Sequence, residues 1–85
     1  MTPELETLDQ LLGGDMALTT IRGLYPHDDA CRDGILGLLR GGDVQLLGPD
    51  NLEIPRWRWP ALFANDKAWS GLVLRLTEQG LARIA

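Results

Sequence analysis

The sequence offers very few of the side chains from which catalytic and metal sites are built. It contains one cysteine and one histidine in 85 residues. A single cysteine cannot form an intrachain disulfide, so we expect a free, buried thiol and a cytoplasmic location. The single histidine suggests no catalytic triad, and no pair of carboxylates stands at a spacing typical of acid–base catalysis. Neither Gly13-Gly14 nor Gly41-Gly42 follows a strand and opens a helix, as a phosphate-binding loop does. The sequence therefore predicts a protein that is not an enzyme and holds no cofactor.

Long apolar runs are missing as well. A membrane span needs about 20 consecutive apolar residues, and no segment comes close to that length. The first ten residues, MTPELETLDQ, are polar and acidic, which is atypical of a secretory signal. The 45% hydrophobic and 24% charged residues are proportions typical of globular proteins. We therefore expect one small soluble domain over residues 1–85, with one modest core and no membrane contact.

Basic residues are scarce in the first part of the chain, and acidic residues are scarce in the second. Residues 1–50 carry nine acids and three arginines, whereas residues 51–85 carry five basic residues and three acids. The net charge of −4 therefore combines an acidic N-terminal part with a basic C-terminal part. Such an asymmetry bears on the choice of partner rather than on the fold.

Helical periodicity predicts three helices in the first 40 residues. A first helix is expected between Thr2-Pro3, a typical helix start, and the terminating pair Gly13-Gly14. A second is expected from Asp15 to Tyr25, because the following proline disfavours helical geometry. A third opens at Asp28 or Asp29 and ends with Arg40.

Alternating patterns predict strands after residue 42. Residues 43–47, DVQLL, read as a strand, and the turn GPDN is followed by a return strand that starts with Leu52 and Ile54. Residues 72–77 predict a further strand, with Leu72, Leu74 and Leu76 facing one way and Val73, Arg75 and Thr77 the other. Thr77 is expected to cap a short C-terminal helix in which Leu81 and Ile84 face inward.

This order of elements resembles that of the winged helix-turn-helix superfamily. The stretch LLRGGDVQLL looks like that family's junction between the third helix and the first wing strand. The stretch LRLTEQGLARI is similar to its last wing strand and following helix. The resemblance covers most of residues 5–85 and implies an α+β fold, in which a three-helix bundle precedes a small antiparallel wing-like sheet and a short C-terminal helix. The interval 55–71 is longer than a simple wing, so strand pairing there stays open.

One shared core is expected from the apolar positions of these elements. Its predicted members are Leu8, Leu11, Ile21, Leu24, Ile35, Leu38, Leu74 and Leu76.

The stretch YPHDDACRD, residues 25–33, concentrates the histidine, the cysteine and three aspartates. His27 and Cys31 have the spacing of two metal ligands on one helix face, but zinc needs three or four ligands and no second histidine or cysteine exists. The aspartates lack the glycine of a calcium-binding loop. A Cys–His nucleophile needs contact between the two side chains, whereas His27 is expected before the helix and Cys31 on its apolar side. We therefore interpret the stretch as a helix start, in which aspartates satisfy free backbone N–H groups and Cys31 packs as a hydrophobic residue.

The stretch IPRWRWPALF, residues 54–63, is the least ordinary segment. In an extended strand Trp57 and Trp59 would lie on one side and Arg56 and Arg58 on the other. The four residues could form a partner surface, because tryptophan and arginine are enriched where proteins bind. Alternatively, the tryptophans belong to the core, and the arginines are solvated or pair with acids of the N-terminal part.

The winged-helix resemblance implies that the third helix could read duplex DNA. That helix exposes three acids beside Arg32 and Arg40, which opposes approach to a polyanion. The wing could still contribute cations. The candidate nucleic-acid contacts are Arg32, Arg40, Arg56, Arg58, Lys67 and Arg75.

Two functions follow from these patterns. The first is a protein-interaction or adaptor module, whose partner is another protein or a second copy of the chain. The second is a DNA-binding transcriptional regulator. The acidic candidate recognition helix favours the first.

Because no further histidine or cysteine stands beside His27 and Cys31, we predict that the protein does not bind zinc. We expect the purified protein to carry no stoichiometric zinc, and a chelator to leave its melting temperature unchanged. Elemental analysis and thermal unfolding with and without chelator measure this. One equivalent of bound metal would contradict the helix-start interpretation.

Overall fold

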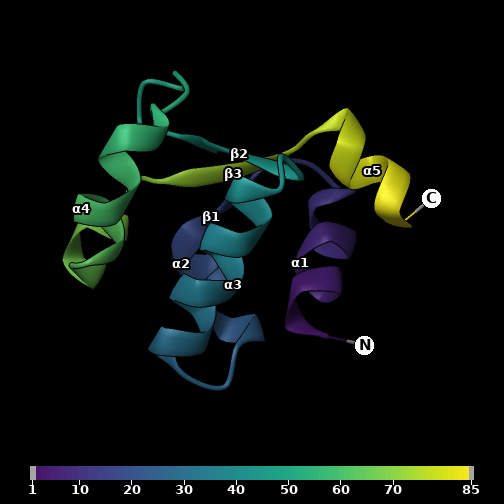
Figure 1. Ribbon diagram of the computed structural model, residues 1–85, viewed down its shortest axis with the longest axis horizontal. Helices are drawn as coiled ribbons and strands as arrows, with labels where there is room; N and C mark the ends of the chain where they lie inside the picture. Colours follow the sequence, from purple (N-terminus) through teal and green to yellow (C-terminus); the bar gives the residue numbers. More distant parts are fainter. Residues whose placement is uncertain (1, 85) are drawn as a thin grey trace.

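Over residues 2–84, the chain interleaves short helices with three short strands (Figure 1). The computed structural model describes residues 2–84, apart from the side chain of Asp66. The α-helices and strands are, in chain order, α1 (Pro3–Leu11), β1 (Met16–Ala17), α2 (Leu18–Ile21), α3 (Asp28–Arg40), β2 (Val44–Leu47), α4 (Trp59–Phe63), β3 (Val73–Leu76) and α5 (Glu78–Ile84). Three 3-10 helices join them: η1 (Arg22–Leu24), η2 (Arg56–Arg58) and η3 (Asp66–Trp69). The predicted α+β class is confirmed.

The sheet is antiparallel, with β3 between β1 and β2. Leu74 of β3 lies opposite Met16 on one side and Leu46 on the other, and its side chain is fully buried. In Figure 1 the strands run along one edge of the molecule, α4 lies at one end, and α1 and α5 lie at the other. Within residues 2–84, none of the helices is both long and apolar enough to cross a bilayer.

The first and third predicted helices are confirmed. Thr2 caps α1, and its hydroxyl accepts a hydrogen bond from the backbone N–H of Leu5 at 3.2 Å. Helix α3 begins at Asp28, but its N-cap is His27 rather than an aspartate: Nδ1 of His27 accepts from the N–H of Ala30 at 3.1 Å. The two aspartates occupy the first turn, where their charges oppose the helix dipole.

The prediction of one helix from Asp15 to Tyr25 is wrong. Residues 16 and 17 instead form β1, and only α2 and η1 follow. Asp15 does not cap a helix, because its carboxylate accepts three hydrogen bonds from Arg75 of β3: one at 3.2 Å to Oδ1, and two at 2.8 Å and 3.1 Å to Oδ2. Pairing with a distant strand therefore overrides the local helical pattern. The sheet is also not a separate unit after the helices, since its first strand precedes α2.

The strands at 43–47 and 72–77 are confirmed as β2 and β3, but the return strand at Leu52 and Ile54 is not formed. Only an isolated bridge joins Leu47 to Glu53. Pro55, which has no backbone N–H, follows at once, and the chain turns into η2 and α4. The tryptophan-rich segment is therefore helical, and the expectation that its side chains alternate on an extended strand is wrong.

One core joins the helices to the sheet. Six of the predicted core residues are buried, and Leu24 and Leu76 are half-buried against the same cluster. Sequence patterns did not assign Phe63 and Trp69 to this core, although both are buried.

Of the two residues expected to face inward on α5, Ile84 packs against the core, whereas Leu81 is 44% exposed; the close approach of the helix occurs at Gly80. A Cβ atom on Gly80 would lie 2.1 Å from the backbone carbonyl oxygen of Asp43, so only glycine permits this approach. The buried carboxylate of Asp43 accepts a hydrogen bond from Arg83, and the hydroxyl of Thr77 donates to the carbonyl of Gly42 at 2.6 Å.

The burial of Leu38 and the exposure of Leu81 predict different effects of the same substitution on stability. Leu38 is buried in the core, so Leu38→Ala should lower the free energy of unfolding by about 2–5 kcal/mol. Leu81→Ala removes a similar side chain from an exposed helix position and should cost less than about 1 kcal/mol. Urea denaturation of the two variants measures the difference. Equal costs would show that α5 buries Leu81 in solution.

Candidate interaction groove

A row of three side chains runs along α3 beside its buried face. Arg32, Leu36 and Arg40 follow one another at intervals of four residues, so they share one side of the helix. The neighbouring side, which carries Ile35 and Leu38, is buried in the core. Leu36 is half-buried, whereas Arg40 is exposed.

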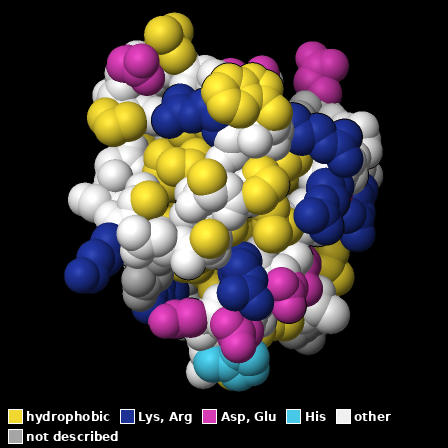
Figure 2. All heavy atoms as spheres, turned by 60° about the vertical axis from the view of Figure 1, so that its left-hand side comes forward, with side chains coloured by type: hydrophobic (Ala, Val, Ile, Leu, Met, Phe, Trp, Pro, Cys, Tyr) yellow, Lys and Arg dark blue, Asp and Glu magenta, His cyan; other side chains and the backbone are white. Residues whose placement is uncertain are grey.

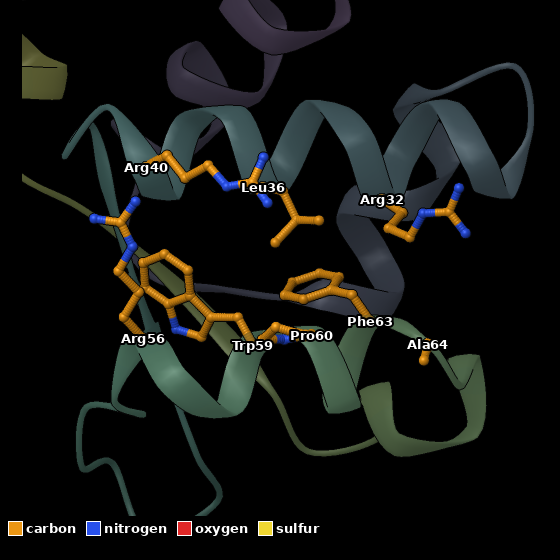
Figure 3. Close-up of a pocket in the computed structure, with 8 residues that line it drawn as sticks. All are labelled: Arg32, Leu36, Arg40, Arg56, Trp59, Pro60, Phe63 and Ala64. Atoms are coloured by element: carbon orange, nitrogen blue, oxygen red, sulfur yellow. The ribbon is translucent and has the colours of Figure 1, made fainter.

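Helix α4 lies opposite this row and closes a groove (Figure 3). Trp59 and Phe63, one turn apart, point across the gap toward Leu36, and Arg56 of η2 extends toward Arg40. The groove encloses about 440 Å³. Its lining residues are Arg32, Leu36, Arg40, Arg56, Trp59, Pro60, Phe63 and Ala64.

Helix α4 is fixed by aromatic contacts on its core side. Phe63 meets Trp69 of η3 edge to face, with ring centroids 5.7 Å apart. The indole N–H of Trp69 donates to the carbonyl of Leu62 at 3.2 Å, and the guanidinium of Arg22 lies 5.4 Å from the Trp69 ring centre. Trp59 donates from its indole N–H to the carbonyl of Ile54 at 3.2 Å, which ties the start of α4 to the end of the loop.

The two ends of the groove differ in charge. At one end, the Arg56 guanidinium lies 5.8 Å from the Trp59 ring centre and near Arg40. No carboxylate among the described side chains forms an ion pair with either arginine. At the other end, Arg32 approaches Asp29 and Asp33, each at 3.4 Å. In Figure 2 apolar side chains gather in the middle of this face, basic ones lie on either side, and acidic ones cluster near the histidine.

The four residues of the predicted interaction surface do not share one environment. Arg56 and Trp59 line the groove, whereas Arg58 lines a second hollow between the loop that follows β2 and η3. Trp57 is 80% exposed, so it is not a core residue. Sequence reasoning missed Leu36 and Phe63. The four-residue spacing of Arg32, Leu36 and Arg40 could have placed Leu36 between the two arginines on one helix face, but no sequence signal points to Phe63.

The six candidate nucleic-acid contacts divide in the same way. Arg32, Arg40 and Arg56 surround the groove, and Arg58 faces the second hollow. Lys67 is exposed on η3. Arg75 on β3 pairs with Asp15, and this contact raises the pKa of the guanidinium.

The histidine, cysteine and aspartates of residues 25–33 do not converge on one site, because the start of α3 points them in different directions. His27 is exposed and caps the helix, whereas Cys31 is fully buried. Asp28 pairs with Arg22, and the hydrogen bonds from this guanidinium lower the pKa of the carboxyl group. In the described part of the chain, no group of three or more His, Cys, Asp or Glu side chains could hold a metal ion.

The environment of Cys31 predicts an unreactive thiol. Burial raises its pKa to about 11, so at pH 8 the native protein holds far less thiolate than an unfolded chain. Because the Cys31 side chain is also fully buried, labelling by a disulfide reagent at pH 8 should be at least about tenfold slower in the native protein than in denaturant. Rapid labelling of the native thiol would support the rejected Cys–His nucleophile.

Comparison with protein-family models, with curated proteins and with solved structures gives no match for this chain.

Proposed function

We propose that this chain is a non-catalytic protein-interaction module on a winged-helix-like scaffold, and that the α3–α4 groove is its binding surface. The observation that carries the proposal is the combination of an apolar floor with three arginines at the rim. The residues that dominate the binding energy of protein interfaces are often tryptophans and arginines that cluster in well-packed pockets.

The order of elements supports the scaffold. Three helical segments, α1, α2 and α3, precede β2, and β3 returns antiparallel beside it. The long segment between β2 and β3 occupies the position of a wing, but it carries α4 back across α3.

The same segment weighs against the alternative, a DNA-binding regulator. In that reading α3 would enter the major groove of the duplex. Here the row of Arg32 and Arg40 faces α4, and Asp28, Asp29 and Asp33 stand at the start of the helix. Arg32 is already paired with Asp29 and Asp33, so Arg40 is the arginine of this row left to neutralise a phosphate.

A matched pair of charge reversals tests the function. Arg56 and Arg58 are both exposed and two residues apart, yet only Arg56 lines the α3–α4 groove. Arg56→Glu should remove proteins that the wild type captures from a lysate of the source cells, whereas Arg58→Glu should retain them. Quantitative mass spectrometry of the captured proteins measures this, and circular dichroism checks that both variants fold.

In a second experiment, the binding of the wild type and both variants to random-sequence duplex DNA is measured at low salt. If the two variants capture the same proteins as the wild type, the groove is not the binding surface. If Arg56→Glu leaves protein capture unchanged but weakens a DNA binding that depends strongly on salt, a DNA-binding regulator explains the data better.

A further inference from the structure

The spacing of the groove residues restricts what can bind there. Arg32, Leu36 and Arg40 repeat every four residues of α3. A helix rises about 1.5 Å per residue, so the Cα atoms of the two arginines lie about 12 Å apart along the axis, with Leu36 midway. A ligand that satisfies all three positions must offer one apolar group between two anionic groups at this spacing.

The floor of the groove calls for a bulky apolar side chain. Leu36, Trp59 and Phe63 converge from the two helices (Figure 3). Phe63 and Trp59 are held by their contacts to Trp69 and Ile54, so the floor exists before a ligand arrives. Such preorganisation lowers the entropic cost of binding.

The arginines at the rim require negative charges on the ligand, and the two ends of the groove differ in how strongly they attract them. Arg40 of α3 and Arg56 of η2 both line the groove, and no described carboxylate is ion-paired with either. At the other end Asp29 and Asp33 share Arg32. The carboxylate that faces Arg40 and Arg56 should therefore contribute more than the one that faces Arg32.

The walls favour a helical ligand over an extended one. The longer wall is α3, a helix of 13 residues whose backbone groups are bonded within the helix except at its ends, so it offers an extended peptide no row of backbone partners. An extended peptide would leave backbone N–H and C=O groups unpaired against the apolar floor, whereas a helix satisfies its own.

Building on the proposed function, we infer that the groove binds a helix of a partner protein that presents carboxylate, large apolar side chain and carboxylate at positions i, i+4 and i+8. The apolar residue packs on the floor formed by Leu36, Trp59 and Phe63. The carboxylates face Arg32 and the Arg40–Arg56 pair.

A designed peptide tests the inference. The probe is an alanine-rich peptide, held helical by a side-chain lactam on its outer face, with glutamate, leucine and glutamate at these positions. Binding should shift the NMR signals of the Leu36 methyl groups and the Trp59 indole N–H, and should weaken as salt is added. Arg40→Glu should weaken the affinity at least about fivefold, and Arg58→Glu less than about twofold.

Three control peptides sharpen the test. One carries lysines in place of the glutamates, one moves the second glutamate to the opposite helix face, and one is extended with the triad at i, i+2 and i+4. The inference is overturned if any of these binds as well as the probe, or if the probe does not bind. It is also overturned if sedimentation shows a dimer of the chain that Arg40→Glu dissolves, because the occupant is then a second copy.

The inference and the proposed function can fail separately. Arg56-dependent capture of a protein, without binding of the probe, keeps the function and rejects the acidic helix. If no captured protein depends on Arg56 and the probe does not bind, both fail.

Discussion

The candidate site depends on the burial of Trp69. This side chain is 2% exposed, and its contacts with Phe63, Leu62 and Arg22 hold the short α4 against the rest of the molecule. Helix α4 has only five residues and is too short to be stable by itself. Without the Trp69 anchor, the segment between β2 and β3 would have little to keep it opposite α3, and the face of α3 that carries Leu36 would lie open to solvent.

The uneven charge of the sequence is partly neutralised by the fold. Arg75 pairs with Asp15 and Arg83 with Asp43, so two basic residues of the C-terminal part bind acids of the N-terminal part. Arg56 and Arg58 have no such ion pair among the described side chains. The positive charge that remains in the C-terminal part therefore lies in the tryptophan-rich segment and at the exposed Lys67 of η3.

Sequence patterns predicted the elements whose signals are local. Thr2-Pro3 and the stretch before Asp28 mark helix starts through capping chemistry, and residues 72–77 alternate as a strand. The patterns failed where distant contacts decide. Asp15 was expected to cap a helix, but it pairs with Arg75, sixty residues away. The groove could not be derived from sequence, because Leu36 and Phe63 have no local signal that brings them together.

The central claim is that α4 lies across the arginine–leucine row of α3 in solution. Nuclear Overhauser effects in the isolated protein test it directly, without a partner. We expect cross-peaks from the Leu36 methyl groups to the ring protons of Phe63 or Trp59, together with cross-peaks between the Phe63 and Trp69 rings. If the Phe63–Trp69 contacts are present but Leu36 shows no contact with α4, the groove does not form. If both sets are absent, the anchoring of α4 by Trp69 is wrong as well.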